Sequence, residues 1–165
     1  MTTDAEVLAE RITVLFRQTP MAVAVAAVNA SLMAAILLAD GVAPAAWWLG
    51  CVLVVVVARL GLAWAWWRDP ARRARARHWG RLGSCGAGAA GLVLGAGAAW
   101  LWPQSETSQL LWVFLVGGMC LGAAGLHHAY APAALAFILP AALPPCRWSR
   151  AMRCPAATTA WPPRG

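Results

Sequence analysis

Residues 47–81 read WWLGCVLVVVVARLGLAWAWWRDPARRARARHWGR, an apolar run with tryptophans at both ends, followed by a segment rich in arginine. A helix from Trp47 to Trp66 is about 28 Å long, close to the ~30 Å thickness of the hydrocarbon core of a bilayer. Tryptophan is enriched at both membrane interfaces, and arginine in cytoplasmic loops. The stretch therefore predicts a transmembrane helix that ends on the cytoplasmic side.

The composition of the 165-residue chain is that of a helical membrane protein: 61% of the residues are hydrophobic and only 12% are charged. A soluble domain is about half apolar and about a quarter charged. The basic residues are all arginine, which excludes chemistry that needs a lysine, such as a P-loop or a Schiff base. The length leaves no room for a soluble catalytic domain beside the spans, so we expect no enzymatic activity and no cofactor.

Apolar runs of spanning length recur along the chain, and they predict an all-α, polytopic helical membrane protein. A transmembrane helix needs about 20 apolar residues. Residues 1–20 have an amphipathic pattern and are expected to form a cytoplasmic lead-in, with Pro20 ending one helix or starting the next. The predicted transmembrane module covers residues 21–143, with four spans at about 21–39, 45–66, 82–102 and 110–130.

A fifth apolar segment, residues 131–143, is predicted to be incomplete. It would be only about 20 Å long as a helix, it contains Pro140, and Pro144 and Pro145 follow it. Residues 144–165 contain no Leu, Val, Ile or Phe, and their arginines would stand outside if the segment crossed. Two alternatives follow: the segment is re-entrant, or the chain is truncated or frameshifted after about residue 143 and ends in a disordered tail. We favour the second, because the residue types of this tail are those that GC-rich codons give when read out of frame.

The orientation is predicted from the arginines, because positively charged loops stay in the cytoplasm. The loop between the second and third runs is rich in arginine, whereas the connectors at 40–44 and 103–109 contain none. The N-terminus is therefore expected to be cytoplasmic. The loop should attract anionic lipid headgroups rather than nucleic acid. The arginines that define this topology are Arg68, Arg72, Arg73, Arg75, Arg77 and Arg81.

Few residues in the spans suggest chemistry. Arg59 is the only charge inside a predicted span, and we expect it to reach the headgroups, since Trp64 follows about 7 Å along the helix. His78, His127 and His128 are expected at one interface, where they are candidates for a metal site or a pH sensor. Their spacing matches no zinc or haem motif, so ordinary interfacial histidines are the favoured interpretation and no metal is predicted.

Small residues spaced by four indicate close helix packing. Gly91 and Gly95 form such a pair in the third run, and Gly118 and Gly122 form another in the fourth. Packing inside one chain is favoured, and homodimerisation through the same glycines remains an alternative.

The motifs LFRQTP at residues 15–20 and HHAYAPAALAFILPAALP at residues 127–144 carry a resemblance to a known group of proteins. Together with the arginine-rich loop, they resemble the N-terminal membrane modules of bacterial sensor histidine kinases, hybrid kinases and diguanylate cyclases. The resemblance implies a sensory and anchoring role in two-component or related signal transduction at the inner membrane, with no catalytic residues of the chain's own. The alternatives are a small transporter or channel subunit and a nonfunctional gene fragment.

Overall fold

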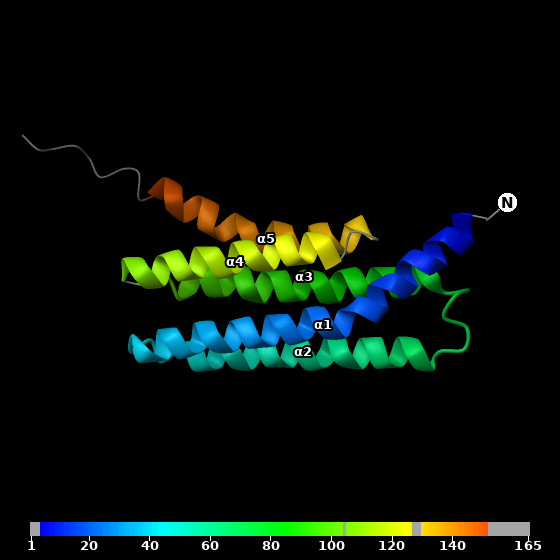
Figure 1. Cartoon of the computed structure of the whole chain (residues 1–165), viewed down its shortest axis with the longest axis horizontal. Helices are drawn as coiled ribbons and strands as arrows, with labels where there is room; N and C mark the ends of the chain where they lie inside the picture. The colour runs from blue at the N-terminus through cyan, green and yellow to red at the C-terminus, as the bar shows by residue number, and fades with distance from the viewer. Residues whose placement is uncertain (1–3, 104, 127–129, 152–165) are drawn as a thin grey trace, which may run out of the picture.

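The computed structural model describes residues 4–103, 105–126 and 130–151, and over these ranges it contains helices and no strands. The all-α prediction is confirmed. Five helices follow one another along a bundle, as Figure 1 shows: α1 (Asp4–Ala39), α2 (Ala45–Arg68), α3 (Ala76–Trp100), α4 (Glu106–Leu126) and α5 (Ala131–Ala151).

Helices α1 to α4 are each long and apolar enough to span a membrane, and α5 has a shorter apolar part, Ala131–Ala142. The shortest of the four, α4, is about 32 Å long at 1.5 Å per residue, which matches the hydrocarbon core. The chain is therefore a multi-pass helical membrane protein.

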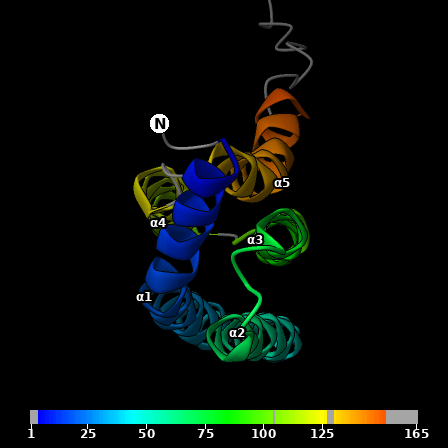
Figure 2. The same ribbon diagram turned by 90° about the vertical axis from the view of Figure 1, so that its right-hand side faces the viewer.

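The helices run alternately up and down, so their connections gather at two ends of the bundle. We call one the arginine end, where residues 69–75 join α2 to α3, and the other the opposite end, where residues 40–44 join α1 to α2. Helix α3 packs mainly on α5, and α1 mainly on α2. Figure 2, which views the arginine end, shows α1 between α2 and α4.

Helix α1 continues through Pro20, so the lead-in and the first span form one helix rather than two. Pro20 has no N–H to donate to the carbonyl of Phe16, and the Thr19 hydroxyl donates to the carbonyl of Leu15 (2.9 Å). Both features favour a bend. Figure 1 shows the N-terminal part of α1 inclined to the remainder. The lead-in and the first span are therefore continuous in backbone, with a bend between them.

Helix α5 extends to Ala151, beyond the boundary expected at residue 143, with Pro140, Pro144 and Pro145 inside it. The fixed φ of proline, near −65°, is itself helical, although each proline removes one hydrogen bond. Packing on α3 holds the first part of α5: a Cβ at Gly91 would collide with the backbone carbonyl of Phe137. The remaining tail, residues 152–165, lies outside the described residues.

Helix α4 begins at Glu106, earlier than the apolar run starting near Leu110 indicated. The reason is a polar cap. The Ser105 hydroxyl accepts a hydrogen bond from the backbone N–H of Ser108 (3.2 Å), which is the usual role of serine at a helix N-terminus. The Ser108 hydroxyl in turn donates to Asp40 Oδ2 (2.9 Å), so the start of α4 is tied to the end of α1.

The tryptophans near the ends of the helices divide into two groups. Those exposed on the bundle surface are Trp47, Trp64, Trp67 and Trp100, whereas Trp48, Trp66, Trp79 and Trp112 are buried between helices. The rings of the buried group therefore pack against other helices of the bundle. Successive residues on a helix point about 100° apart, so in the pairs Trp47–Trp48 and Trp66–Trp67 one ring faces outward and the other faces the core.

Candidate functional site

Three aromatic rings at the arginine end join the lead-in helix to the next two helices. Phe16 of α1 stacks on Trp66 of α2 at 4.9 Å between ring centroids, with 13° between the planes. Trp79 of α3 meets both rings edge to face, at 6.0 Å from Phe16 and 5.8 Å from Trp66. Such pairs contribute about 1 kcal/mol each beyond the area they bury. We call these residues the aromatic cluster.

Asp69 organises the loop that follows the aromatic cluster. Its carboxylate accepts hydrogen bonds from Trp79 Nε1 (2.9 Å), Arg75 Nη2 (3.0 Å) and the backbone N–H of Ala71 (2.9 Å). The hydrogen bond from Trp79 is the largest cause that lowers the pKa of the Asp69 carboxyl below its usual value, and the Ala71 N–H and the charges of Arg75 and Arg72 act in the same direction. The loop is thereby attached to α3 through a charged hydrogen bond.

The arginines of this loop form an exposed, basic surface. Arg68 lies over the ring of Trp64, 4.1 Å from its centroid, and Arg72 lies over Trp67 at 5.2 Å while donating to the Trp67 carbonyl (3.0 Å). Arg72 is partly buried, whereas the other arginines of this segment are exposed: Arg68, Arg73, Arg75, Arg77 and Arg81. Guanidinium groups over outward-facing indoles combine the charge and the aromatic surface that an anionic membrane interface accommodates.

The structure contradicts the expected position of Arg59. Its residue surface is only 8% exposed, and the side chain lies inside the bundle instead of extending to the headgroups. The Arg59 Cγ packs against Gly86 of α3, at a distance of 3.4 Å from the point where a Cβ would stand. Sequence alone did not reveal this, because the direction in which α2 faces depends on its neighbours. An ionisable residue inside a membrane domain is a functional candidate by default.

Two small cavities adjoin Arg59, and we call them together the Arg59 site. One, of about 20 Å³, lies toward α3; the other, of about 60 Å³, lies between α1, α4 and α5. They share Ala26, Arg59, Met119 and Phe137. Among the described residues that line them, Arg59 alone is charged, and the remainder are apolar or glycine.

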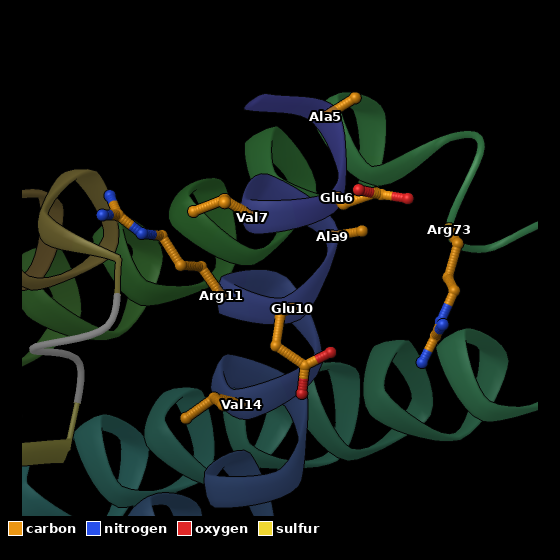
Figure 3. Close-up of a pocket in the computed structure, with 8 residues that line it drawn as sticks. All are labelled: Ala5, Glu6, Val7, Ala9, Glu10, Arg11, Val14 and Arg73. Atoms are coloured by element: carbon orange, nitrogen blue, oxygen red, sulfur yellow. The ribbon is translucent and has the colours of Figure 1, made fainter. Parts of the chain in front are cut away.

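A larger hollow lies on the surface where the lead-in helix passes the arginine loop. It measures about 690 Å³ and is lined by the first turns of α1 and by Arg73 (Figure 3). Figure 3 shows Glu6 and Glu10 on the side toward Arg73, with Val7 and Arg11 extending to the other side. The hollow is open, and its lining carries both acidic and basic side chains. It therefore adds polar surface to the arginine end.

The structure describes only some of the other residues that sequence singled out. His78 is exposed at the start of α3, with its ring edge to face with Trp79 at 6.2 Å, whereas His127 and His128 lie outside the described residues. No group of three metal-binding side chains occurs in the described part of the chain. Gly91 and Gly95 are buried in α3. A Cβ at Gly118 or Gly122, by contrast, would meet open space, so neither packs against a helix of the same chain.

Comparison of the chain with protein family models, with characterised proteins and with solved structures finds no match.

Proposed function

We propose that the chain is the sensory and anchoring membrane module of a bacterial signal-transduction protein. In this proposal it lies in the inner membrane with its N-terminus and arginine end in the cytoplasm, and it has no catalytic activity of its own. The partners are the bilayer, through anionic headgroups at the arginines, and a downstream output domain.

The observation that carries the proposal is the aromatic cluster. It joins the lead-in part of α1 to the end of α2 and the start of α3, through Phe16, Trp66 and Trp79. Because α1 is one helix from Asp4 to Ala39, a change in packing deep in the bundle is transmitted to the arginine end. Small shifts of packed helices are a common switching element in membrane sensors and other regulated proteins.

The course of α5 adds a requirement. Helix α5 runs parallel to α3, from the arginine end toward the opposite end. A cytoplasmic output domain joined downstream of α5 therefore needs one further membrane crossing. The kinase and cyclase membrane modules that the chain resembles also have such a last span.

The test is to read the gene beyond codon 143 in all three frames. We expect an apolar segment of about 20 residues, then the sequence of a PAS, kinase or GGDEF domain. Three frames that contain neither would overturn the proposal.

The burial of Arg59 favours one alternative, a small transporter, because buried charges often mark ion pathways. Transport also needs polar groups along a path. The intramembrane polar residues Asn29, Ser31 and Ser84 are not among the residues lining the Arg59 site. Flux of anions into liposomes that contain the purified chain would support this alternative over a sensor.

A further inference from the structure

We infer that the C-terminal end of α2 binds an anionic lipid that carries two phosphates in one headgroup, as cardiolipin does. The site consists of Trp64, Trp67, Arg68 and Arg72, which we call the tryptophan–arginine surface. The inference deepens the proposed function by naming the lipid class at the arginine end, and it rests on that function for the bilayer as partner. Binding itself is a property of the purified chain.

Two guanidinium groups are held by aromatic rings at the end of α2. Arg68 lies over the ring of Trp64, 4.1 Å from its centroid, and Arg72 lies over Trp67 at 5.2 Å. Trp64 and Trp67 are three residues apart on one helix, so their rings are neighbours on its surface. Two positive charges therefore lie close together. Two phosphates joined through one glycerol match this arrangement better than a lipid with a single phosphate.

The tryptophan–arginine surface has hydrogen-bond donors for phosphate oxygens, and its charge is not neutralised. A guanidinium has five N–H donors, of which Arg72 uses Nη1 for the Trp67 carbonyl (3.0 Å). Asp69 is the only acidic residue in residues 41–105. Its side chain is only 9% exposed and pairs with Arg75 (3.0 Å). Arginine forms bidentate, charged hydrogen bonds with phosphate, so a phosphate headgroup fits this surface.

The lipid-facing side of α2 offers a track for the acyl chains. Val54, Val57 and Leu60 are exposed at intervals of three residues before Trp64, so they share one face of the helix. A Cβ at Gly61 would meet open space. From Val54 to Trp64 the helix rises about 15 Å, which is half of the ~30 Å hydrocarbon core. A lipid with its headgroup at the arginines can therefore lay its chains along this face.

The experiment is native mass spectrometry of the purified full chain in detergent, titrated with cardiolipin or with phosphatidylglycerol at equal total phosphate. We expect cardiolipin to bind about fivefold more tightly, which is the effect of one additional arginine–phosphate contact near a membrane surface. Inorganic pyrophosphate has two phosphates but no acyl chains. It should not displace cardiolipin at the same concentration.

Two variants with matched controls test the assignment. Arg68→Gln should lower the affinity for cardiolipin about fivefold and remove the preference over phosphatidylglycerol, because one phosphate loses its partner. Arg17→Gln, at an exposed arginine of α1, removes the same charge and should preserve the preference. Trp64→Leu removes the ring under Arg68 and should lower the affinity about threefold. Trp47→Leu, at an exposed tryptophan near the other end of α2, should not.

Each of four results would overturn the inference: equal affinity for the two lipids, an unchanged preference in folded Arg68→Gln, a lost preference in Arg17→Gln, or displacement by pyrophosphate. If Arg68→Gln fails to fold, the comparison at equal phosphate and Trp64→Leu decide the matter. None of these measurements depends on a downstream domain. A chain that binds the lipid but whose gene encodes no output domain would lose the proposed function and keep this one, so the two failures are distinguishable.

Discussion

At the scale of single residues, two glycine pairs with the same spacing have different surroundings. Gly91 is covered by the backbone of α5 at Phe137, while Gly118 on α4 has open space where its side chain would be. Glycine destabilises a helix by about 1 kcal/mol relative to alanine. Close packing between helices can offset this loss of stability. Packing with α5 offsets the cost at Gly91, whereas at Gly118 no contact among the described residues offsets it.

Substitution by alanine should therefore lower the stability of the protein at Gly91 but not at Gly118. Gly91→Ala forces α3 and α5 apart and should lower the free energy of unfolding by about 1–3 kcal/mol, the usual cost of overpacking. Gly118→Ala should leave it unchanged or raise it by up to about 1 kcal/mol. Thermal unfolding in detergent micelles, followed by tryptophan fluorescence, measures both. A Gly91→Ala protein as stable as the native one would contradict the observed α3–α5 contact.

A second residue-scale prediction concerns pH. The lowered pKa of Asp69 means that its carboxylate contributes stability above the ordinary aspartate pKa of about 3.9, and that this contribution is lost as the pH falls through the lower, folded-state pKa. Trp79→Phe removes the largest cause of the lowering. The fall in melting temperature from about pH 7 to about pH 3 should then be smaller than in the native protein.

The control for this pH effect is Trp100→Phe, at a tryptophan exposed on the bundle surface, which should leave the acid sensitivity unchanged. Asp69→Asn should remove the contribution of this group altogether. If Trp79→Phe lost as much stability on acidification as the native protein, the hydrogen bond between Trp79 and Asp69 would not be what lowers the pKa.

At the scale of the helices, the start of α4 depends on a polar cap and not on hydrophobicity. Ser105→Ala removes the acceptor for the Ser108 N–H and should cost about 1 kcal/mol of stability. Hydrogen exchange at the Ser108 amide should also become faster. Thr107→Ala, at an exposed neighbouring position, is the matched control and should change neither. Unchanged exchange at Ser108 in Ser105→Ala would show that the cap does not hold this end.

Sequence predicted the helices that are long and apolar enough to span a membrane, such as α2. It could do so because the thickness of a bilayer sets their length and apolar character. It placed the start of α4 too late, since hydropathy does not register a cap such as Ser105. It also missed the burial of Arg59 and Trp66. Both residues lie on α2, which is apolar nearly all round, so no polar face indicates which side turns toward the bundle. Only the packing of neighbouring helices decides this.

At the scale of the whole molecule, charge is distributed unequally between the two ends. The arginine end combines the exposed arginines of residues 68–81 with the lead-in of α1, while the connector at residues 40–44 has no arginine. Against this, α5 carries Arg147 and Arg150 toward the opposite end. Loop charges near the ends of early helices usually dominate the orientation, although late charges can oppose it.

The orientation of the chain in the membrane can be measured by labelling single cysteines with a maleimide that does not cross membranes. Arg77→Cys, near the arginine end, should react only in inverted inner-membrane vesicles, whereas Glu106→Cys should react in intact spheroplasts. The background for both variants is a chain in which the five native cysteines are replaced by serine: Cys51, Cys85, Cys120, Cys146 and Cys154. Reaction of Arg77→Cys from outside would mean that the arginines of α5 prevail and that the lead-in helix is periplasmic. The proposed coupling to a cytoplasmic output domain would then fail.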